Sequence, residues 1–250
     1  MMFSDDEIER YARHLILREI GGPGQQRLKG ARVLIIGAGG IGSPAALYLA
    51  AAGVGTLGLV DADTVSLSNL QRQILFATGE VGLAKTEAAA RRLGDLNPHV
   101  QIQTHPVWIG PDNAEALIRD YDLVLDGCDD FATRLCVNAA CVHTKVPLVS
   151  AALGRWSGQV GVFTGQPCYQ CLVPEIPPEA ETCARVGVVG ALAGVMGSMA
   201  ALEAIKVLTG AGSPLTGRLM LYDSLGGLAR TVTVAADPAC PVCSAKAARE

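Results

Sequence analysis

A short apolar run that ends in a cluster of glycines constrains the fold of this chain more than any other feature. Residues 32–36 read Arg-Val-Leu-Ile-Ile, residues 37–42 read Gly-Ala-Gly-Gly-Ile-Gly, and small residues continue to about Ala52. The apolar run is typical of a buried strand, and the small residues after it favour a helix. In that context the pattern G-x-G-x-x-G lets backbone N–H groups and a helix N-terminus approach phosphate, because the glycines lack Cβ atoms. We therefore predict a nucleotide site at Gly37, Gly39, Gly40 and Gly42; the alternative is that these glycines only permit tight packing of helix on strand.

Strand-like and helix-like segments alternate through the first part of the chain, which predicts parallel strands with right-handed crossovers. Further strands are expected at residues 56–60, 100–107 and 123–125, and helices from about Lys85, at 112–119 and at 132–143. Past Pro147, glycine turns separate the strand-like runs 147–152, 159–163, 218–222 and 231–234, and a helix at 190–208 interrupts them. We expect an α/β fold with a Rossmann-like mixed, mostly parallel sheet, helices on both faces and C-terminal antiparallel strands.

Apolar residues at helical spacing near the start of the chain predict an N-terminal helical segment outside the sheet. The segment begins at Asp5, carries Ile8, Tyr11 and Leu15 on one side, and is expected to end at the glycines of residues 21–24.

Composition limits the class of protein. The chain has 250 residues, half of them apolar, which is enough for one domain over residues 1–250. Twenty basic residues against 24 acidic ones make nucleic acid an unexpected partner. The first thirty residues lack an apolar leader, and the later apolar stretches carry too many glycines and charges for a membrane span. We expect a cytoplasmic protein with no membrane partner.

Charged residues after the second expected strand distinguish two kinds of nucleotide. Asp61 ends that strand about twenty residues after the glycines, where an acid accepts hydrogen bonds from ribose hydroxyls of either NAD or ATP. Arg72 and Lys85 follow, and a triphosphate needs such cations more than a dinucleotide does. Asp126 and Asp129, at the end of the fourth expected strand, are predicted to hold Mg²⁺ through oxygen ligands or water.

Four of the eight cysteines form two identical short patterns. Cys168 and Cys171 make one C-x-x-C pair, and Cys240 and Cys243 make the other. Two such pairs complete a tetrahedral thiolate shell, which predicts one structural Zn²⁺ per chain that clips the C-terminal strands to the body of the fold. A pair of redox motifs is the alternative, but the second pair does not stand at a helix start where a thiolate is activated. Cys128, Cys136 and Cys141 are expected to pack in the core.

The run Asp61-Ala-Asp-Thr-Val-Ser-Leu-Ser-Asn-Leu-Gln-Arg-Gln73 resembles the signature of the MoeB/ThiF family, relatives of ubiquitin-activating enzymes. The resemblance covers nearly the whole chain. It includes residues 10–13, the glycine loop, Lys85, residues 125–129, Arg134, Asn138, both C-x-x-C pairs and residues 181–183. The chain resembles the short bacterial members of this family. These adenylate the C-terminal glycine of a MoaD-like or ThiS-like sulfur carrier ending in Gly-Gly and act as homodimers.

The resemblance assigns roles residue by residue. It implies that Gly40 and Asp61 bind the nucleotide, that Ser68, Asn69 and Arg72 bind ribose and phosphates, that Lys85 binds phosphates, and that Asp129 holds magnesium. It also implies that Arg13 reaches the ATP of the neighbouring subunit. Family members usually show Asp-Cys-Thr-Asp-Asn where this chain has Asp-Gly-Cys-Asp-Asp at residues 126–130, so Asp130 departs from the pattern.

The expected division of the chain follows from that resemblance. Residues 1–30 form the helical segment, 31–150 the nucleotide-binding half, and 151–250 the carrier-binding and zinc half. Cys183 follows a stretch rich in proline and glutamate, where a thiol is able to capture an activated carboxylate or simply to pack. A cysteine desulfurase or a rhodanese is the expected sulfur donor.

The reaction that the residues favour is carboxylate adenylation. A carboxylate is already ionised at neutral pH, so no general base is needed, and Arg13, Arg72 and Lys85 are expected to neutralise the triphosphate. The pathway is left open between molybdopterin, which is preferred, and thiamine. Two functions of other classes also stay open, an NAD- or FAD-dependent oxidoreductase and a zinc scaffold without catalysis.

Overall fold

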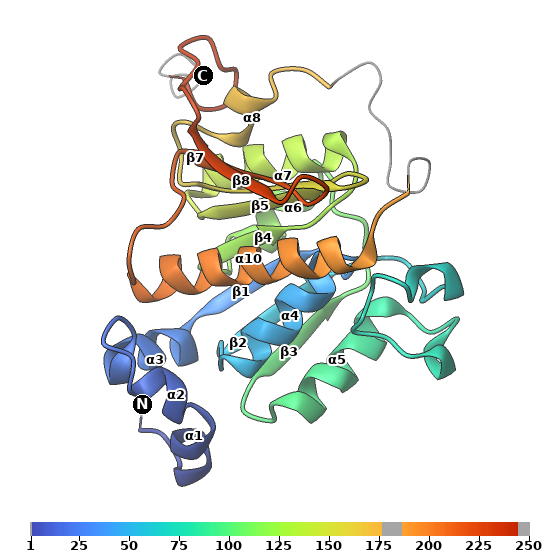
Figure 1. Cartoon of the computed structure of the whole chain (residues 1–250), viewed down its shortest axis with the longest axis vertical. Helices are drawn as coiled ribbons and strands as arrows, with labels where there is room; N and C mark the ends of the chain where they lie inside the picture. The colour runs from blue at the N-terminus through green and yellow to red at the C-terminus, as the bar shows by residue number, and fades with distance from the viewer. Residues whose placement is uncertain (1, 177–186, 245–250) are drawn as a thin grey trace.

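A single eight-stranded sheet runs through the structure, a computed structural model that describes residues 2–176 and 187–244 (Figure 1). In chain order the strands are β1 (Arg32–Ile36), β2 (Thr56–Val60), β3 (Gln101–His105), β4 (Leu123–Asp126), β5 (Leu148–Leu153), β6 (Ser157–Phe163), β7 (Arg218–Asp223) and β8 (Leu228–Thr233). They lie side by side in the order β3-β2-β1-β4-β5-β6-β7-β8. Pairing is parallel from β3 to β5 and antiparallel from β5 to β8. This confirms the predicted α/β class and its mixed sheet.

Helices cover both faces of the sheet (Figure 1). They are α1 (Asp5–Arg10), α2 (Ala12–Leu15), α3 (Gly21–Gly30), α4 (Gly42–Ala51), α5 (Lys85–Leu96), α6 (Ala114–Ile118), α7 (Phe131–Thr144), α8 (Tyr169–Leu172) and α10 (Gly190–Thr209), with 3-10 turns at Leu67–Asn69 and Thr78–Glu80. The helices α4, α5 and α10 pack on one face, and α6 and α7 pack on the other. Alternate residues of one strand therefore enter different cores: Val33 and Ile35 pack with α4, whereas Leu34 and Ile36 pack with α6 and α7. Burial on both faces explains why these strands read as continuous apolar runs.

The N-terminal segment corrects one prediction. The glycines at residues 21–24 do not end a helix; they begin α3, with Gly21 at φ +55° and Pro23 inside the first turn. Proline is tolerated there because the first N–H groups of a helix have no partner within it. Helix α3 forms from these glycines to Gly30 because its residue Leu28 is completely buried in the core. The predicted single helix is instead α1 and α2 followed by α3.

Helix α10 is long and apolar enough, by composition alone, to span a membrane, and it is the only such helix in the described part of the chain. It packs against α4 and against β5 and β6, and residues such as Met196 and Ala200 are fully buried there. One side of α10 is therefore packed in the core, while Leu202 on the same helix is exposed.

Candidate functional site

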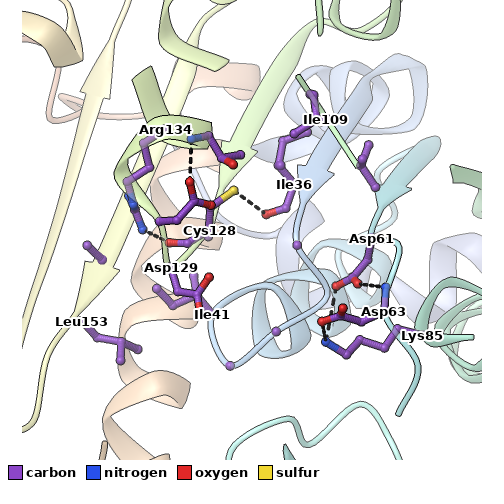
Figure 2. Close-up of a pocket in the computed structure, with 18 of the residues that line it drawn as sticks. Ile36, Ile41, Asp61, Asp63, Lys85, Ile109, Cys128, Asp129, Arg134 and Leu153 are labelled. Atoms are coloured by element: carbon purple, nitrogen blue, oxygen red, sulfur yellow. Dashed lines mark hydrogen bonds and ion pairs between the residues drawn. The ribbon is translucent and has the colours of Figure 1, made fainter. Parts of the chain in front are cut away.

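A cavity of about 430 Å³ opens at the carboxyl ends of β1, β2 and β4, beside the glycine loop (Figure 2). Strand β1 lies between β2 and β4, so the chain leaves it on one side for β2 and returns on the other as β4. In open α/β sheets this reversal of strand order leaves a crevice, and ligands bind there. The volume is within the range of sites for drug-sized ligands.

The glycine loop requires glycine at two of its predicted positions, for different reasons. Gly37 has φ +85°, in the left-handed region that favours glycine. A Cβ atom on Gly42 would lie 1.9 Å from the carbonyl oxygen of Gly37. The side chain of Asp61 accepts a hydrogen bond from the backbone N–H of Ala38 at 2.9 Å, which ties β2 to this loop. Tight packing is thus present at Gly42, which supports the loop without lining the cavity, whereas Gly37, Gly39 and Gly40 line it.

Lys85 enters the cavity at the start of α5 as part of a charged cluster in which Lys85 is buried and Asp63 is exposed (Figure 2). Its Nζ lies 2.8 Å from an oxygen of Asp63 and 3.8 Å from Asp61, and the residue is only 5% exposed. Burial raises the pKa of the Asp61 carboxyl. The charge of Lys85 and hydrogen bonds from the N–H groups of Asp63 and Ala38 lower this pKa, but burial has the larger effect. These two carboxylates balance the charge of Lys85.

The turn after β2 supplies the second cation. Arg72 lines the cavity together with Asn69, and its Nη1 donates to the carbonyl oxygen of Ser68 at 3.1 Å. The Ser68 side chain does not line the cavity; its Oγ lies 3.1 Å from the Oγ of Ser66 on the surface. Gln73 is a lining residue that sequence reasoning missed, and within the described part of the chain its buried Oε1 has no hydrogen-bond partner. Its sequence signal was its place at the end of the run 61–73, directly after Arg72.

The loop after β4 separates two aspartates that were predicted to act together. Asp129 is exposed on the cavity lining, but Asp126 is 1% exposed and forms an ion pair with Arg134 at 3.3 Å. Asp126 also accepts the backbone N–H of Cys128 at 2.9 Å. The predicted role of Asp126 as a magnesium ligand is therefore wrong, because its oxygens face protein groups. Asp130 caps α7 by accepting the N–H of Thr133 at 2.8 Å, a task that asparagine performs equally well.

The remaining predicted residues divide into three groups. The cavity lining brings together Gly37, Gly39, Gly40, Asp61, Asn69, Arg72, Lys85 and Asp129. Arg13 is exposed on α2 and does not line the cavity of its own chain. Cys183 lies outside the described residues.

The four cysteines of the two C-x-x-C pairs converge near the C-terminal end of the chain. Their sulfur atoms all lie within 4.8 Å of one another, with Cys168 and Cys240 3.7 Å apart and Cys171 and Cys243 3.4 Å apart. A tetrahedral ZnS₄ site with bonds of about 2.3 Å has S–S edges of about 3.8 Å, which this cluster approaches. Asn138, on α7, donates to the sulfur of Cys168 at 3.4 Å. The cluster fits a metal such as zinc, with Asn138 as an outer partner.

A second, more open hollow of about 720 Å³ lies over β6, β7 and β8. It shares Ala152, Leu153 and Gln159 with the lining of the first cavity, so the two adjoin. Asp223 and Arg230 give it charges of both signs. Sequence reasoning gave no signal for this hollow, because its residues come from four strands.

Comparison with known proteins gives one family model and several similar proteins. The model of the ThiF family matches residues 11–242. The Sulfur carrier protein adenylyltransferase of Thermus thermophilus is 47% identical over 252 residues, which is 97% of this chain and 93% of the relative. The Molybdopterin-synthase adenylyltransferase of Escherichia coli is 49% identical over 245 residues, covering 96% and 98%. A third relative, the probable adenylyltransferase/sulfurtransferase MoeZ of Mycobacterium tuberculosis, is 45% identical, and the chain spans 63% of its length.

Among solved structures, Escherichia coli MccB with ATP has a TM-score of 0.83 and 25% sequence identity. The match covers 94% of this chain and 74% of that one.

Proposed function

This chain belongs to the ThiF family and is an adenylyltransferase, and we propose that ATP, bound at the glycine loop, is its nucleotide. Its second substrate is a small ubiquitin-like sulfur carrier that ends in Gly-Gly. The observation that carries the proposal is the cavity itself, in which glycine backbone, Lys85 and Arg72 meet at one end of the sheet. That set suits a polyphosphate, and it exceeds what a dinucleotide requires.

The proposed step joins a carboxylate to the α-phosphate of ATP. A terminal glycine oxygen attacks the α-phosphorus, a new O–P bond forms, and the bond from that phosphorus to the bridging oxygen breaks. Pyrophosphate leaves with the bond's electrons, and the product is an acyl-adenylate. Two anions meet in this step, so positioned cations do most of the work.

The residues of the chain divide that work. Arg72 and Lys85 orient the triphosphate and stabilise charge on the leaving pyrophosphate, while Asp61 holds the ribose. As phosphate oxygens approach Lys85, they compete with Asp63 for its ammonium group. Mg²⁺, when bound, would neutralise phosphate charge, and we assign Asp129 to hold it because this carboxylate is exposed on the cavity lining.

The hollow over β6, β7 and β8 offers the carrier a path to the α-phosphate. It adjoins the nucleotide cavity at Leu153 and Gln159, and an extended Gly-Gly tail is slender enough to lie along such a groove. Residues 31–150 then form the nucleotide-binding half of a single domain, and 151–250 form the carrier-binding half. The thiolate cluster holds one structural zinc, which clips the C-terminal strands to α7 and α8.

A homodimer completes the proposed site. Arg13 is absent from its own cavity, and large apolar side chains are exposed on nearby elements: Ile16 after α2 (73%), Tyr48 on α4 (58%) and Leu202 on α10 (59%). A two-fold interface over these side chains would carry Arg13 to the partner's ATP.

The remaining parts of the proposal concern the pathway. The enzyme works in the cytoplasm on a molybdopterin-type carrier, with a thiamine-type carrier as the alternative. Cys183 captures the activated carboxylate, and a cysteine desulfurase or a rhodanese donates the sulfur.

Exchange of labelled pyrophosphate into ATP tests the function. With Mg-ATP and a cognate carrier ending in Gly-Gly, exchange is expected because adenylation is reversible. The matched control is the same carrier lacking its last glycine, which should give none. Absence of exchange with molybdopterin-type and thiamine-type carriers, in protein that is folded and metal-loaded, would contradict the proposal. A melting temperature raised by NAD and not by ATP would favour an oxidoreductase.

A further inference from the structure

The nucleotide cavity has one apolar end that no predicted site residue explains. Its lining there consists of side chains from the ends of β1 and β2 and from the segment after β3: Ile36, Val60, Val107, Trp108 and Ile109. Figure 2 shows Ile109 beside Ile36, apart from Lys85 and Asp129. The cavity thus has a charged part and an apolar part.

Asp61 stands between the two parts. Residue Val60 of β2 pairs with His105 of β3, and the Asp61 N–H donates to the His105 carbonyl oxygen at 3.3 Å. The segment that carries Trp108 therefore leaves the sheet beside Asp61. With phosphates at Lys85 and ribose at Asp61, the flat apolar part of ATP, its base, falls at the end lined by Val107, Trp108 and Ile109.

Trp108 is unusual within this lining because 73% of the residue is exposed. Its backbone is nevertheless tied on both sides. Asn113 Nδ2 donates to the Trp108 carbonyl oxygen at 2.9 Å, and the Asn113 side-chain oxygen accepts the Gly110 N–H at 2.9 Å. On the other side, the Val107 N–H donates to the His105 carbonyl oxygen at 2.8 Å. A fixed backbone with a ring left in water leaves only side-chain rotation to bring the indole over a ligand.

We propose that Trp108 stacks on the nucleotide base and closes the apolar end of the cavity. This inference rests on the proposed function and adds a binding residue to it. An indole in water loses apolar exposure when a base covers it, and base–aromatic stacking needs no particular base because every base has a π face. Trp108 therefore sets how tightly the base is held, and it does not select adenine over guanine.

The base lies far from the reacting phosphorus and does not change during the reaction. Stacking on it is therefore equal in the ground state and the transition state, and its loss raises KM for ATP without lowering kcat. Loss of Lys85 or Arg72, which contact the reacting phosphates, would lower kcat. This difference separates Trp108 from the charged residues.

Fluorescence gives a direct test, because the chain has only two tryptophans and Trp156 does not line the cavity. In a Trp156→Phe background, Mg-ATP should change the emission of Trp108, and inorganic tripolyphosphate should not. By equilibrium dialysis, Trp108→Ala should weaken ATP and GTP about tenfold each, with tripolyphosphate affinity within about twofold of the parent. Trp108→Phe should recover most of the ATP affinity. In pyrophosphate exchange, KM for ATP should rise by the same factor while kcat stays within about twofold.

Three outcomes would overturn the proposal. If the parent protein binds ATP and Trp108→Ala binds it equally well, the stacking role is wrong while the proposed function stands. If the carrier alone, without ATP, produces the emission change, Trp108 belongs to a protein interface. If the folded parent binds no ATP by dialysis, the proposed function fails and this inference fails with it.

Discussion

The guanidinium of Arg134 and the carboxylate of Asp126 lie 3.3 Å apart beneath the loop that carries Asp129, and both residues are at least 96% buried. Arg134 also donates to the carbonyl oxygens of Cys128 and Ala151, so one side chain joins the end of β4 to β5. Asp126 is in turn held by the Ser150 hydroxyl at 3.3 Å. The pair therefore holds in position the loop that carries Asp129, the proposed magnesium ligand.

Removing one member of this pair should destabilise the fold strongly. Arg134→Met leaves the Asp126 carboxylate buried without its cation, which costs about 3 to 5 kcal/mol in the free energy of unfolding. Urea unfolding measures it. The matched control is Arg91→Met, which breaks an exposed pair with Glu87 on α5 and should cost about 0.5 kcal/mol or less. Equal losses for the two variants would show that the Asp126–Arg134 pair has no special structural role.

The thiolate cluster should hold one zinc per chain. Cys240→Ser should lower the zinc content measured by elemental analysis and lower the melting temperature, because a closed four-thiolate site contributes folding energy. Cys136→Ser, which changes a half-buried thiol of α7 outside the cluster, should keep full zinc content. Reduced wild-type protein purified with well under one zinc per chain would argue against the site.

The Asp61 carboxyl should give stability a measurable pH dependence. Burial raises its folded pKa above the ordinary 3.8, so the folded state binds the proton more tightly than the unfolded state does. The free energy of unfolding should therefore fall as the pH rises from 3.8 through the folded pKa, and Asp61→Asn should remove that part of the slope. Urea unfolding across this pH range, in parallel with Asp95→Asn as an exposed acidic control on α5, checks it. If Asp61→Asn and Asp95→Asn change the slope alike, the assignment to Asp61 is wrong.

Arg13 should act in the partner subunit's site. Arg13→Ala is expected to lower turnover about 10³-fold with less effect on ATP affinity, because a cation supplied across an interface stabilises developing phosphate charge. Mixed with Lys85→Ala, itself nearly inactive, it should restore up to about a quarter of wild-type sites, since a mixed dimer assembles one intact site. Arg18→Ala is the control from the same segment and should keep wild-type turnover. Demonstrated heterodimers without recovery would place Arg13 in its own chain's site or outside the chemistry.

Much of the nucleotide-binding half was predictable because its signals are local. The run at residues 32–36 and the glycines after it specify a buried strand, a tight turn and a helix start within eleven residues, and the structure has all three. The error at residues 21–24 was also local. Glycines were expected to end a helix there, but the burial of Leu28 outweighs their low helix propensity and extends α3 across that region.

Local pattern was therefore enough to predict the backbone path of the glycine loop and the two C-x-x-C thiol pairs, since spacing alone sets which groups a turn presents. The tertiary structure decided the rest. It put Asp126 against Arg134 and left Asp129, three residues later, facing the cavity. The pairing of β2 with β3 also brought the end of β3, from which the segment with Trp108 leaves, beside Asp61. The physical reason is that the role of a charged or aromatic side chain depends on what lies opposite it. Strand order and packing across the sheet determine which residue lies opposite. That residue often comes from a distant part of the chain, which local sequence pattern does not predict.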